Sequence, residues 1–420
     1  MKQMLLHGGQ NCVQAAVMTD GRLIEFYNER SSGKQWVGNV YKGRVVNVLP
    51  GMQAAFVDIG QGKNAFLYID DMLHPNLERQ PKDKPSISEL LKTGQEVIVQ
   101  VMKEPLGGKG ARVTTHYSLP GRYLVYMPNA GYVGVSRKIG TEQERARLRQ
   151  IGESICGEEE GVIMRTIAES VDEQSLRHDA EQLREKWKRV EAMAASAPVP
   201  SELYCDADLL QRVIRDMLTT ETDEIWIDHP ALFEETVAIV SQMAPSLTGR
   251  VRLYESGCGQ PMFERYAVDE QLERAFEPRI RLASGGDLVC DQTEALTVID
   301  VNTGKFTGHH DLEDTVFRTN LEAADEIARL LRLRDIGGII IIDFIDMEQE
   351  QHRELVKQRL EQLIRQDRTK CHVVGWTRLG LLEMTRKKSR ENIMNQLAQP
   401  CEACKGKGKI YISLSRSIYT

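Results

Sequence analysis

Two segments of the sequence carry polar groups directly after aliphatic runs. Asp300 and Asn302 follow residues 297–299 at every second position, and Asp343 follows the isoleucine run 339–342. On a strand, residues two apart share a face, so Asp300 and Asn302 are predicted to lie side by side. If the two runs form neighbouring parallel strands, Asp300 and Asp343 meet at the carboxyl edge of the sheet, where ligands gather in such folds.

Two carboxylates at that edge predict a metal site. About 4 Å apart they repel by roughly 4 kcal/mol near a protein surface, and a shared divalent cation removes that cost. Oxygen ligands favour Mg²⁺, or Mn²⁺, over Zn²⁺, and Mg²⁺ commonly takes one or two protein carboxylates. Such an ion activates water and stabilises charge on a phosphate. Asn302 would then orient a ligand or hold a phosphate oxygen.

The alternative is structural: Asp300 caps a turn and Asp343 pairs with an arginine. Asp346 follows Asp343 by three residues and faces elsewhere if the strand continues. We therefore expect Asp346 at most to interact with the metal ligands and not to bind the metal itself.

A second possible metal site lies near the end of the chain. Cys401 and Cys404, in CEACKGKGK, have the spacing of half a tetrahedral zinc site. The other two ligands would come from elsewhere in this chain or from a second chain. A redox pair, favoured by the neighbouring lysines, and two unpaired structural cysteines are the alternatives.

The elements that position the aspartates follow from the pattern after residue 287. A strand ending at Asp300 precedes an amphipathic helix, an aliphatic strand over 337–346, a charged helix over 348–366 and a strand over 371–376. The apolar stripe of the first helix is Leu312, Val316, Ala323, Ile327 and Leu331. Near-continuous aliphatic strands that alternate with helices predict a buried parallel sheet.

The first half of the chain is built differently. Residues 1–34 alternate around a turn at 19–21 and predict a β-hairpin, and the short strands over 36–118 predict a small closed barrel of the OB type. Strands mix with charged helices over 119–211.

Bulk composition argues against several classes of protein. The 420 residues are 41% hydrophobic and 27% charged with a net charge of −7, which indicates several soluble domains and argues against charge-only nucleic-acid binding. The longest aliphatic run, 339–342, is too short to span a membrane, and no apolar signal region opens the chain, so we expect a cytoplasmic protein. Eight scattered cysteines do not form a disulfide framework.

Several motifs together resemble one family. In order along the chain they are GNVYKG, AAFVDIG, VSRKI, VIMRT, LTVIDVNTG, TNLEAADEIARLLRLRDIGG, IIIIDFIDM, RLGLLEMTRKK and CEAC. In order and composition they resemble the short form of the bacterial RNase E/G endoribonucleases over nearly the whole chain.

The resemblance implies an α+β multidomain fold. In it an RNase H-like subdomain is interrupted by an OB-type barrel and a 5′-sensor, and is followed by a DNase I-like α/β catalytic subdomain and a short zinc-link. The implied segments are the first RNase H-like segment (1–35), the OB-type RNA-binding domain (36–118), the 5′-sensor domain (119–211), the second RNase H-like segment (212–278), the DNase I-like catalytic domain (279–398), the zinc-link (399–410) and a short tail (411–420).

The resemblance also implies the reaction. Asp300 and Asp343 match the aspartates that hold the catalytic magnesium, and Asn302 matches the residue that assists at the scissile phosphate. A metal-activated water would cleave single-stranded RNA and leave a 5′-phosphate and a 3′-hydroxyl, in RNA processing and decay. A non-catalytic RNA-binding protein of the same architecture and a metal-dependent phosphoesterase acting on another substrate, such as DNA, remain alternatives.

RNA contacts are implied in the barrel. Phe56 and Phe66 are aromatics on short strands, and bases stack on aromatics for about 1–3 kcal/mol each. Lys103 and Lys109 flank a glycine-rich loop that can approach a nucleic-acid backbone. The alternative is that both phenylalanines belong to the core.

The 5′-sensor is implied by a second set of residues. Arg165 and Thr166 match the contacts to the terminal monophosphate of RNA, for which a guanidinium and a hydroxyl are suitable donors. Arg137 and Lys138 lie where supporting positive charge belongs.

The resemblance favours zinc shared between protomers through Cys401 and Cys404, which gives a homodimer. Longer family members carry a further dimerisation domain, which does not fit in the short segment 413–420 that follows this motif. Assembly beyond a dimer is therefore left open.

Overall fold

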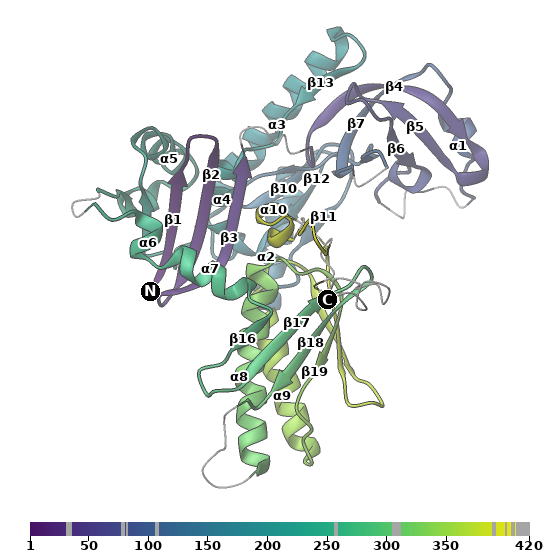
Figure 1. The fold of residues 1–420 in the computed structure, drawn as a ribbon. Coiled ribbons are helices and arrows are strands. Elements are labelled where there is room, and N and C mark those ends of the chain that lie inside the picture. The colour runs from purple at the N-terminus through teal and green to yellow at the C-terminus, as the bar shows by residue number, and fades with distance from the viewer. Residues whose placement is uncertain are drawn as a thin grey trace, which may run out of the picture. The chain divides into compact units, whose positions relative to one another are not determined.

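The computed structural model describes residues 1–30, 36–76, 80, 83–105, 109–255, 259–304, 312–388, 392–399, 401–404 and 408. The chain divides into two units (Figure 1). Unit 1 comprises residues 1–30, 221–235 and 249–420, and unit 2 comprises residues 31–220 and 236–248. No helix in the described part of the chain is long and apolar enough to cross a membrane.

The strands and helices are numbered along the chain. The strands are β1 (Lys2–Gly8), β2 (Cys12–Thr19), β3 (Arg22–Arg30), β4 (Val40–Leu49), β5 (Ala54–Asp58), β6 (Ala65–Tyr68), β7 (Glu96–Lys103), β8 (Arg112–Thr114), β9 (Leu119–Pro120), β10 (Leu124–Met127), β11 (Val133–Val135), β12 (Gly161–Met164), β13 (Ser201–Tyr204), β14 (Glu224–Ile227), β15 (Val251–Leu253), β16 (Arg279–Arg281), β17 (Asp287–Gln292), β18 (Leu296–Asn302), β19 (Gly338–Asp343), β20 (Cys371–Trp376) and β21 (Leu382–Arg386). The helices are α1 (Ile87–Leu90), α2 (Glu142–Ile155), α3 (Glu173–Ser196), α4 (Leu209–Met217), α5 (Pro230–Met243), α6 (Met262–Arg265), α7 (Val268–Phe276), α8 (Leu312–Leu333), α9 (Glu350–Ile364) and α10 (Ile393–Leu397).

The first sheet of unit 1 has the order β15-β14-β1-β2-β3. Its β2–β3 hairpin turns at Asp20 and Gly21, whose φ angles are 49° and 75°. Two successive positive φ values are typical of a type I′ turn, whose twist matches that of the strands it joins. The predicted N-terminal hairpin is confirmed.

The second sheet of unit 1 has the order β16-β17-β18-β19-β21-β20. Among the described strand pairs of this sheet, β18–β19 alone is parallel, so the predicted parallel neighbours are confirmed but the prediction of a wholly parallel sheet is wrong. Strands β20 and β21 form a hairpin that places β21 beside β19. The isoleucine run is also not buried on both faces, because Ile339 is 50% exposed.

Helices α8 and α9 pack on one face of this sheet (Figure 1). Strand β18 alternates in burial, with Thr297, Ile299 and Val301 turned into the core. In β19, Ile340 and Ile342 are fully buried, and their neighbours in sequence face the other side. Of the apolar stripe predicted for α8, Val316, Ala323, Ile327 and Leu331 lie in the same core, whereas Leu312 is 77% exposed, so that part of the prediction is wrong. The opposite face of the sheet is left to carry polar groups.

A buried ion cluster ties the end of this sheet to the helices. Arg386 in β21 donates to Asp335 at 2.6 Å and to Asp367 at 2.8 Å, and each of the three side chains is at most 6% exposed. Arg386 also donates to the carbonyl of Ile336 at 3.0 Å. The cluster holds β21 against the segments that follow α8 and α9.

Unit 2 contains a barrel and a smaller sheet. The barrel has the order β13-β4-β5-β6-β8-β7 and closes through β4–β7, which confirms the barrel predicted for 36–118 and adds β13 from residues 201–204. The smaller sheet, β11-β12-β10-β9, shares a core with α2 and α3. The RNase H-like, 5′-sensor and DNase I-like assignments stay predictions.

Candidate active site and RNA-binding surfaces

The two aspartates predicted to meet are direct partners in the structure. Asp300 and Asp343 lie opposite each other in the parallel register of β18 and β19. Paired residues of neighbouring strands project from the same face. Asn302, two residues further along β18, donates from Nδ2 to Oδ2 of Asp300 at 2.9 Å. The three side chains therefore form one polar group at the carboxyl ends of both strands.

No basic side chain of the described residues compensates the charges at this edge. Partial desolvation, followed by the negative charges of Asp300 and Asp346, raises the pKa of the Asp343 carboxyl. Strand β19 ends at Asp343, so strand alternation no longer applies and Asp346 comes near enough to contribute. Among the described residues, no Lys, Arg or His forms an ion pair with any of the three aspartates. Pairing of Asp343 with an arginine, the structural alternative, is not seen in that part of the chain.

The donor set fits a hard divalent cation. It offers carboxylate oxygens, which Mg²⁺ and Mn²⁺ prefer. No three His, Cys, Asp or Glu side chains converge as ligands on one point in the described part of the chain. The fit is therefore that of a two-carboxylate site with Asp300 and Asp343 as ligands, in which water completes the coordination.

Helix α8 braces the segment that follows β19. The Asn320 amide is fully buried, donating to the carbonyl of Ile345 at 2.8 Å and accepting the Ile345 N–H at 3.1 Å. Two turns earlier in the helix, Glu313 accepts the N–H groups of Glu348 and Gln349 at 3.1 and 3.2 Å. The backbone between and beyond Asp343 and Asp346 is thus held at two places by one helix.

Sequence reasoning missed Asn320, although a signal was present. Val316, Asn320, Ala323 and Ile327 follow the helical period, so Asn320 lies within the apolar stripe of α8. A lone amide in such a stripe needs a buried hydrogen-bond partner, because leaving it unpaired is costly. That requirement indicates a tethering role.

The predicted RNA-binding residues of the barrel form a row. Phe56 and Phe66 are opposed on β5 and β6 with ring centroids 5.9 Å apart, and both are half-buried and outside the barrel core. Arg112 on β8 is the register partner of Phe66 and of the exposed Lys103 on β7. The row therefore combines aromatic and basic groups. Sequence reasoning had missed Arg112, whose guanidinium forms an ion pair with Asp71 at 2.8 Å. Lys109 is exposed near the start of β8.

Part of the predicted 5′-sensor set also converges. The Thr166 hydroxyl lies 2.9 Å from the Ser136 hydroxyl, which in turn accepts the backbone N–H of Lys138 at 3.3 Å. Arg137 and Lys138 are exposed, as is Thr166. Ser136 joins these residues and was not predicted.

The guanidinium of Arg165 has protein partners. It donates to the Gly121 carbonyl and to Asp216, each at 2.5 Å. These contacts use two of the five donors of an arginine, so others remain for a phosphate. Asp179 accepts the N–H groups of Tyr123 and Leu124 at 2.8 and 3.2 Å and so fixes the loop that begins at Gly121. No sequence signal indicated Asp216 or Asp179.

Cys401 and Cys404 lie in one turn, and both thiols are free. The backbone N–H groups of Cys404 and Ala403, and then the Cys404 side chain, lower the pKa of the Cys401 thiol. A thiolate is the form that binds zinc. The pair fits half of a tetrahedral site.

Comparisons with known proteins place these features in one class. The S1 RNA binding domain matches residues 34–115, which hold the strands of the barrel apart from β13, so the chain is an RNA-binding protein built on an S1 barrel. The Ribonuclease E/G family matches residues 118–389, more than half of the chain. The chain belongs to the Ribonuclease E/G family.

Relatives within the family cover the chain almost fully. Ribonuclease G of Haemophilus influenzae is 45% identical over 414 residues, which are 97% of this chain and 84% of the relative. Ribonuclease G of Escherichia coli K12 is 45% identical over 413 residues, which are likewise 97% of this chain and 84% of the relative. Ribonuclease E of Haemophilus influenzae is 39% identical over all of this chain and 45% of its own length.

Proposed function

We propose that this protein is an endoribonuclease that cleaves single-stranded RNA by attack of water on a phosphodiester. The observation that carries the proposal is the parallel register of Asp300 with Asp343, beside Asn302 and without a basic partner among the described residues. Membership of the Ribonuclease E/G family and the S1 barrel support RNA as the substrate.

The roles of the residues follow from their positions. Asp300 and Asp343 would bind Mg²⁺ or Mn²⁺, which when bound supplies an acidified water and positive charge at the phosphate. Asn302 gives one amide hydrogen to Asp300 and so presents its remaining amide groups in a fixed direction, toward a phosphate oxygen. Water oxygen bonds to phosphorus while the bond to the 3′ oxygen breaks. The products carry a 5′-phosphate and a 3′-hydroxyl.

Two surfaces of unit 2 would hold the RNA. The row of Phe56, Phe66 and Lys103 suits an exposed base and its phosphate, because stacking and charge do not require a particular sequence. Arg165 and Thr166 would bind a 5′-monophosphate. Arg165 is already oriented by Gly121 and Asp216, so a phosphate meets a preorganised donor rather than a mobile one.

We further propose that Cys401 and Cys404 of two chains bind one Zn²⁺ and link a homodimer. Two thiolates fill half of a tetrahedral site, and the lowered pKa of Cys401 favours its thiolate form. A second copy of the same turn supplies the other half by symmetry.

Cleavage of a short single-stranded RNA labelled at its 3′ end tests the activity. Magnesium should be required, Asp343→Asn should nearly abolish turnover, and a substrate with a 5′-monophosphate should be cut faster than one with a 5′-hydroxyl. Asp291→Asn is the matched control, because Asp291 is an exposed aspartate on the neighbouring strand β17. Mass spectrometry of the fragments identifies their ends.

The outcomes separate the alternatives. Undiminished turnover in Asp343→Asn would remove the site, and RNA binding without any cleavage in the unchanged protein would favour a non-catalytic RNA-binding protein. Cleavage of single-stranded DNA at an equal rate would favour a general phosphoesterase. Equal rates with both 5′ ends would count against the sensor alone.

A further inference from the structure

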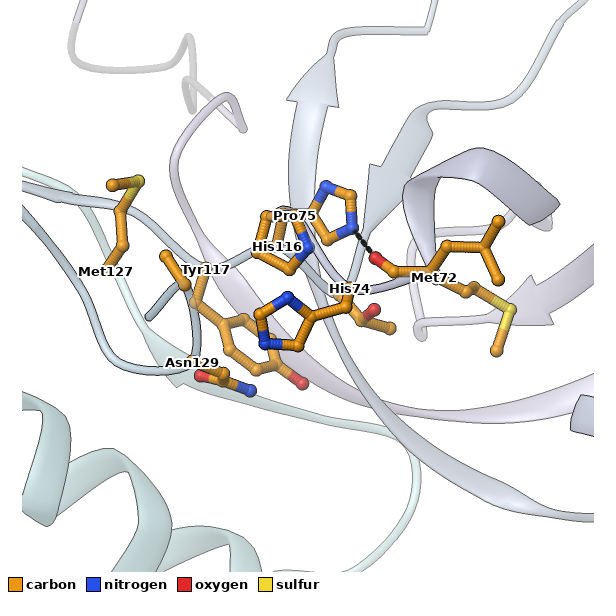
Figure 2. Close-up of a pocket in the computed structure, with 10 residues that line it drawn as sticks. Met72, His74, Pro75, His116, Tyr117, Met127 and Asn129 are labelled. Atoms are coloured by element: carbon orange, nitrogen blue, oxygen red, sulfur yellow. Dashed lines mark hydrogen bonds between the residues drawn. The ribbon is translucent and has the colours of Figure 1, made fainter. Parts of the chain in front are cut away.

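Unit 2 contains a small pocket apart from the residues of these surfaces. Its volume is about 200 Å³, and it is lined by residues 72–75, 115–117, 127 and 129–130. We call it the His74 pocket. Figure 2 shows His74, Tyr117 and Asn129 close together in this view. Pockets for drug-sized ligands begin at about 300 Å³, so this one suits a single ring system.

The pocket contains a buried donor without an acceptor. The backbone N–H of Asn76 donates to Nδ1 of His74 at 3.1 Å, so Nδ1 is an acceptor. In a neutral imidazole the proton then lies on Nε2. The His74 Nε2 atom is buried and has no hydrogen-bond partner among the described residues. Because buried polar groups almost always have a partner, this donor indicates an occupant that offers an acceptor.

The walls of the pocket are fixed in advance. The Tyr117 hydroxyl donates to the carbonyl of Ile98 at 2.9 Å, and its ring packs against Trp187 with centroids 4.5 Å apart. His116 is held through Nε2 by the carbonyl of Leu73 (Figure 2). A preformed wall loses little conformational entropy when a ligand binds.

The described lining of the pocket carries no side chain with a permanent charge. Among the described residues that line the pocket there is no Lys, Arg, Asp or Glu. The polar lining comprises the imidazoles of His74 and His116, the Tyr117 phenol, the Thr115 hydroxyl and the Asn129 amide, and the remaining lining residues are apolar. A flat heteroaromatic group with acceptors on its edge matches this lining, whereas a phosphate would meet no Lys or Arg among the described lining residues.

We propose that the His74 pocket binds one nucleobase of the single-stranded RNA that the S1 barrel carries. The base lies against Tyr117, accepts a hydrogen bond from Nε2 of His74 and meets the Asn129 amide with its edge. Residues 72–75 and 115 lie in the segment that matches the S1 RNA binding domain, which is the reason to choose RNA over a free metabolite. The inference rests on the proposed binding of RNA, but not on cleavage.

Fluorescence of 2-aminopurine tests the site. The base is placed at one position at a time in a 5′-hydroxyl single-stranded RNA, which is titrated with the full-length protein without magnesium. We expect quenching at two positions, one where a base stacks on the row of Phe56 and Phe66 and one in the His74 pocket, and only the second should respond to changes at His74. In His74→Asn the side-chain oxygen can still accept the Asn76 N–H, as in an Asx turn, but the Nε2 donor is gone. Affinity should then fall by about 2- to 10-fold, the effect of one net hydrogen bond.

Two further variants make the result decisive. Asn129→Ala should reduce the quenching of the base in the His74 pocket and the affinity for the RNA. His178→Asn, the same substitution as at His74 but at an exposed histidine of α3, should change neither the affinity nor the quenching. Unchanged affinity and quenching in both His74→Asn and Asn129→Ala would overturn the inference and leave water as the partner of Nε2. Displacement of the quenched base by free adenosine at equal concentration would also overturn the choice of RNA. Failure of the unchanged protein to bind RNA at all would instead refute the proposed function.

Discussion

Replacing Asn320 with leucine should loosen the two aspartates that flank Ile345 without altering either of them. The fully buried amide of Asn320 holds both backbone polar groups of Ile345, at 2.8 and 3.1 Å. Leucine has a similar shape but offers neither a donor nor an acceptor. The segment from Asp343 to Asp346 would keep its packing and lose its hydrogen-bonded anchor.

The size of the effect follows from these two contacts. A buried polar group left without a partner costs about 1–3 kcal/mol, so the loss of two should lower the free energy of unfolding of unit 1 by about 2–6 kcal/mol. Groups that orient metal ligands from outside typically change metal affinity or activity by about 10- to 100-fold. We therefore expect the magnesium concentration for half-maximal cleavage to rise by that factor, while RNA affinity measured without magnesium stays the same.

A magnesium titration of cleavage, with urea unfolding in parallel, checks both numbers. Leu330→Ala is the matched control, because Leu330 is buried in the same helix and its truncation costs about 2–5 kcal/mol. The control should lose stability and keep its magnesium requirement. If Asn320→Leu and Leu330→Ala show the same magnesium dependence, Asn320 acts only on stability and the reasoning fails.

Three further predictions concern stability and assembly. Arg386→Met should lower the free energy of unfolding by about 3–5 kcal/mol in urea, because it removes the buried arginine that forms ion pairs with Asp335 and Asp367; a loss below about 1 kcal/mol would contradict this. The hydrogen bond from Arg184 lowers the pKa of Glu160 to about 2, so its stabilisation is present above the unfolded pKa of about 4.3 and is lost as pH falls toward 2. Glu160→Gln should therefore flatten the pH dependence of unfolding between these limits, and an unchanged slope would refute the pairing. Cys401→Ser with Cys404→Ser should release zinc and shift the mass measured by light scattering toward the monomer, and an unchanged mass would remove the zinc-linked dimer.

The pairing of Asp300 with Asp343 could be predicted because it depends on local patterns. An aliphatic run, a helix and a second aliphatic run make one strand-helix-strand unit, and the polar residue that ends each run then falls at the same edge. The rest of the sheet was predicted wrongly because the same patterns do not specify strand neighbours. A glycine that could have indicated the hairpin was present. Gly380 lies in the turn between β20 and β21, and the structure gives it a φ of 82°.

The contacts that the sequence could not predict join residues far apart along the chain. Asp216 reaches Arg165 across 51 residues, and nothing in either segment specifies that approach. The contact of Asn320 could be predicted in part. Its place in the apolar stripe indicated that the amide has a buried partner, but not that the partner is Ile345. Periodicity fixes which way a side chain faces, and only the packed fold fixes what it meets.

Helix α8 connects the geometry of the candidate site to its stability. As the crossover between β18 and β19 it sets the parallel register that brings Asp300 beside Asp343. The same helix supplies Asn320 and Glu313, which hold the backbone after β19. The repulsion of neighbouring carboxylates opposes this arrangement when no cation is bound. For the proposed metal site, the packing and hydrogen bonds of the helix would have to hold both carboxylates in place without the cation, which is why a change at Asn320 should be seen first in the magnesium requirement.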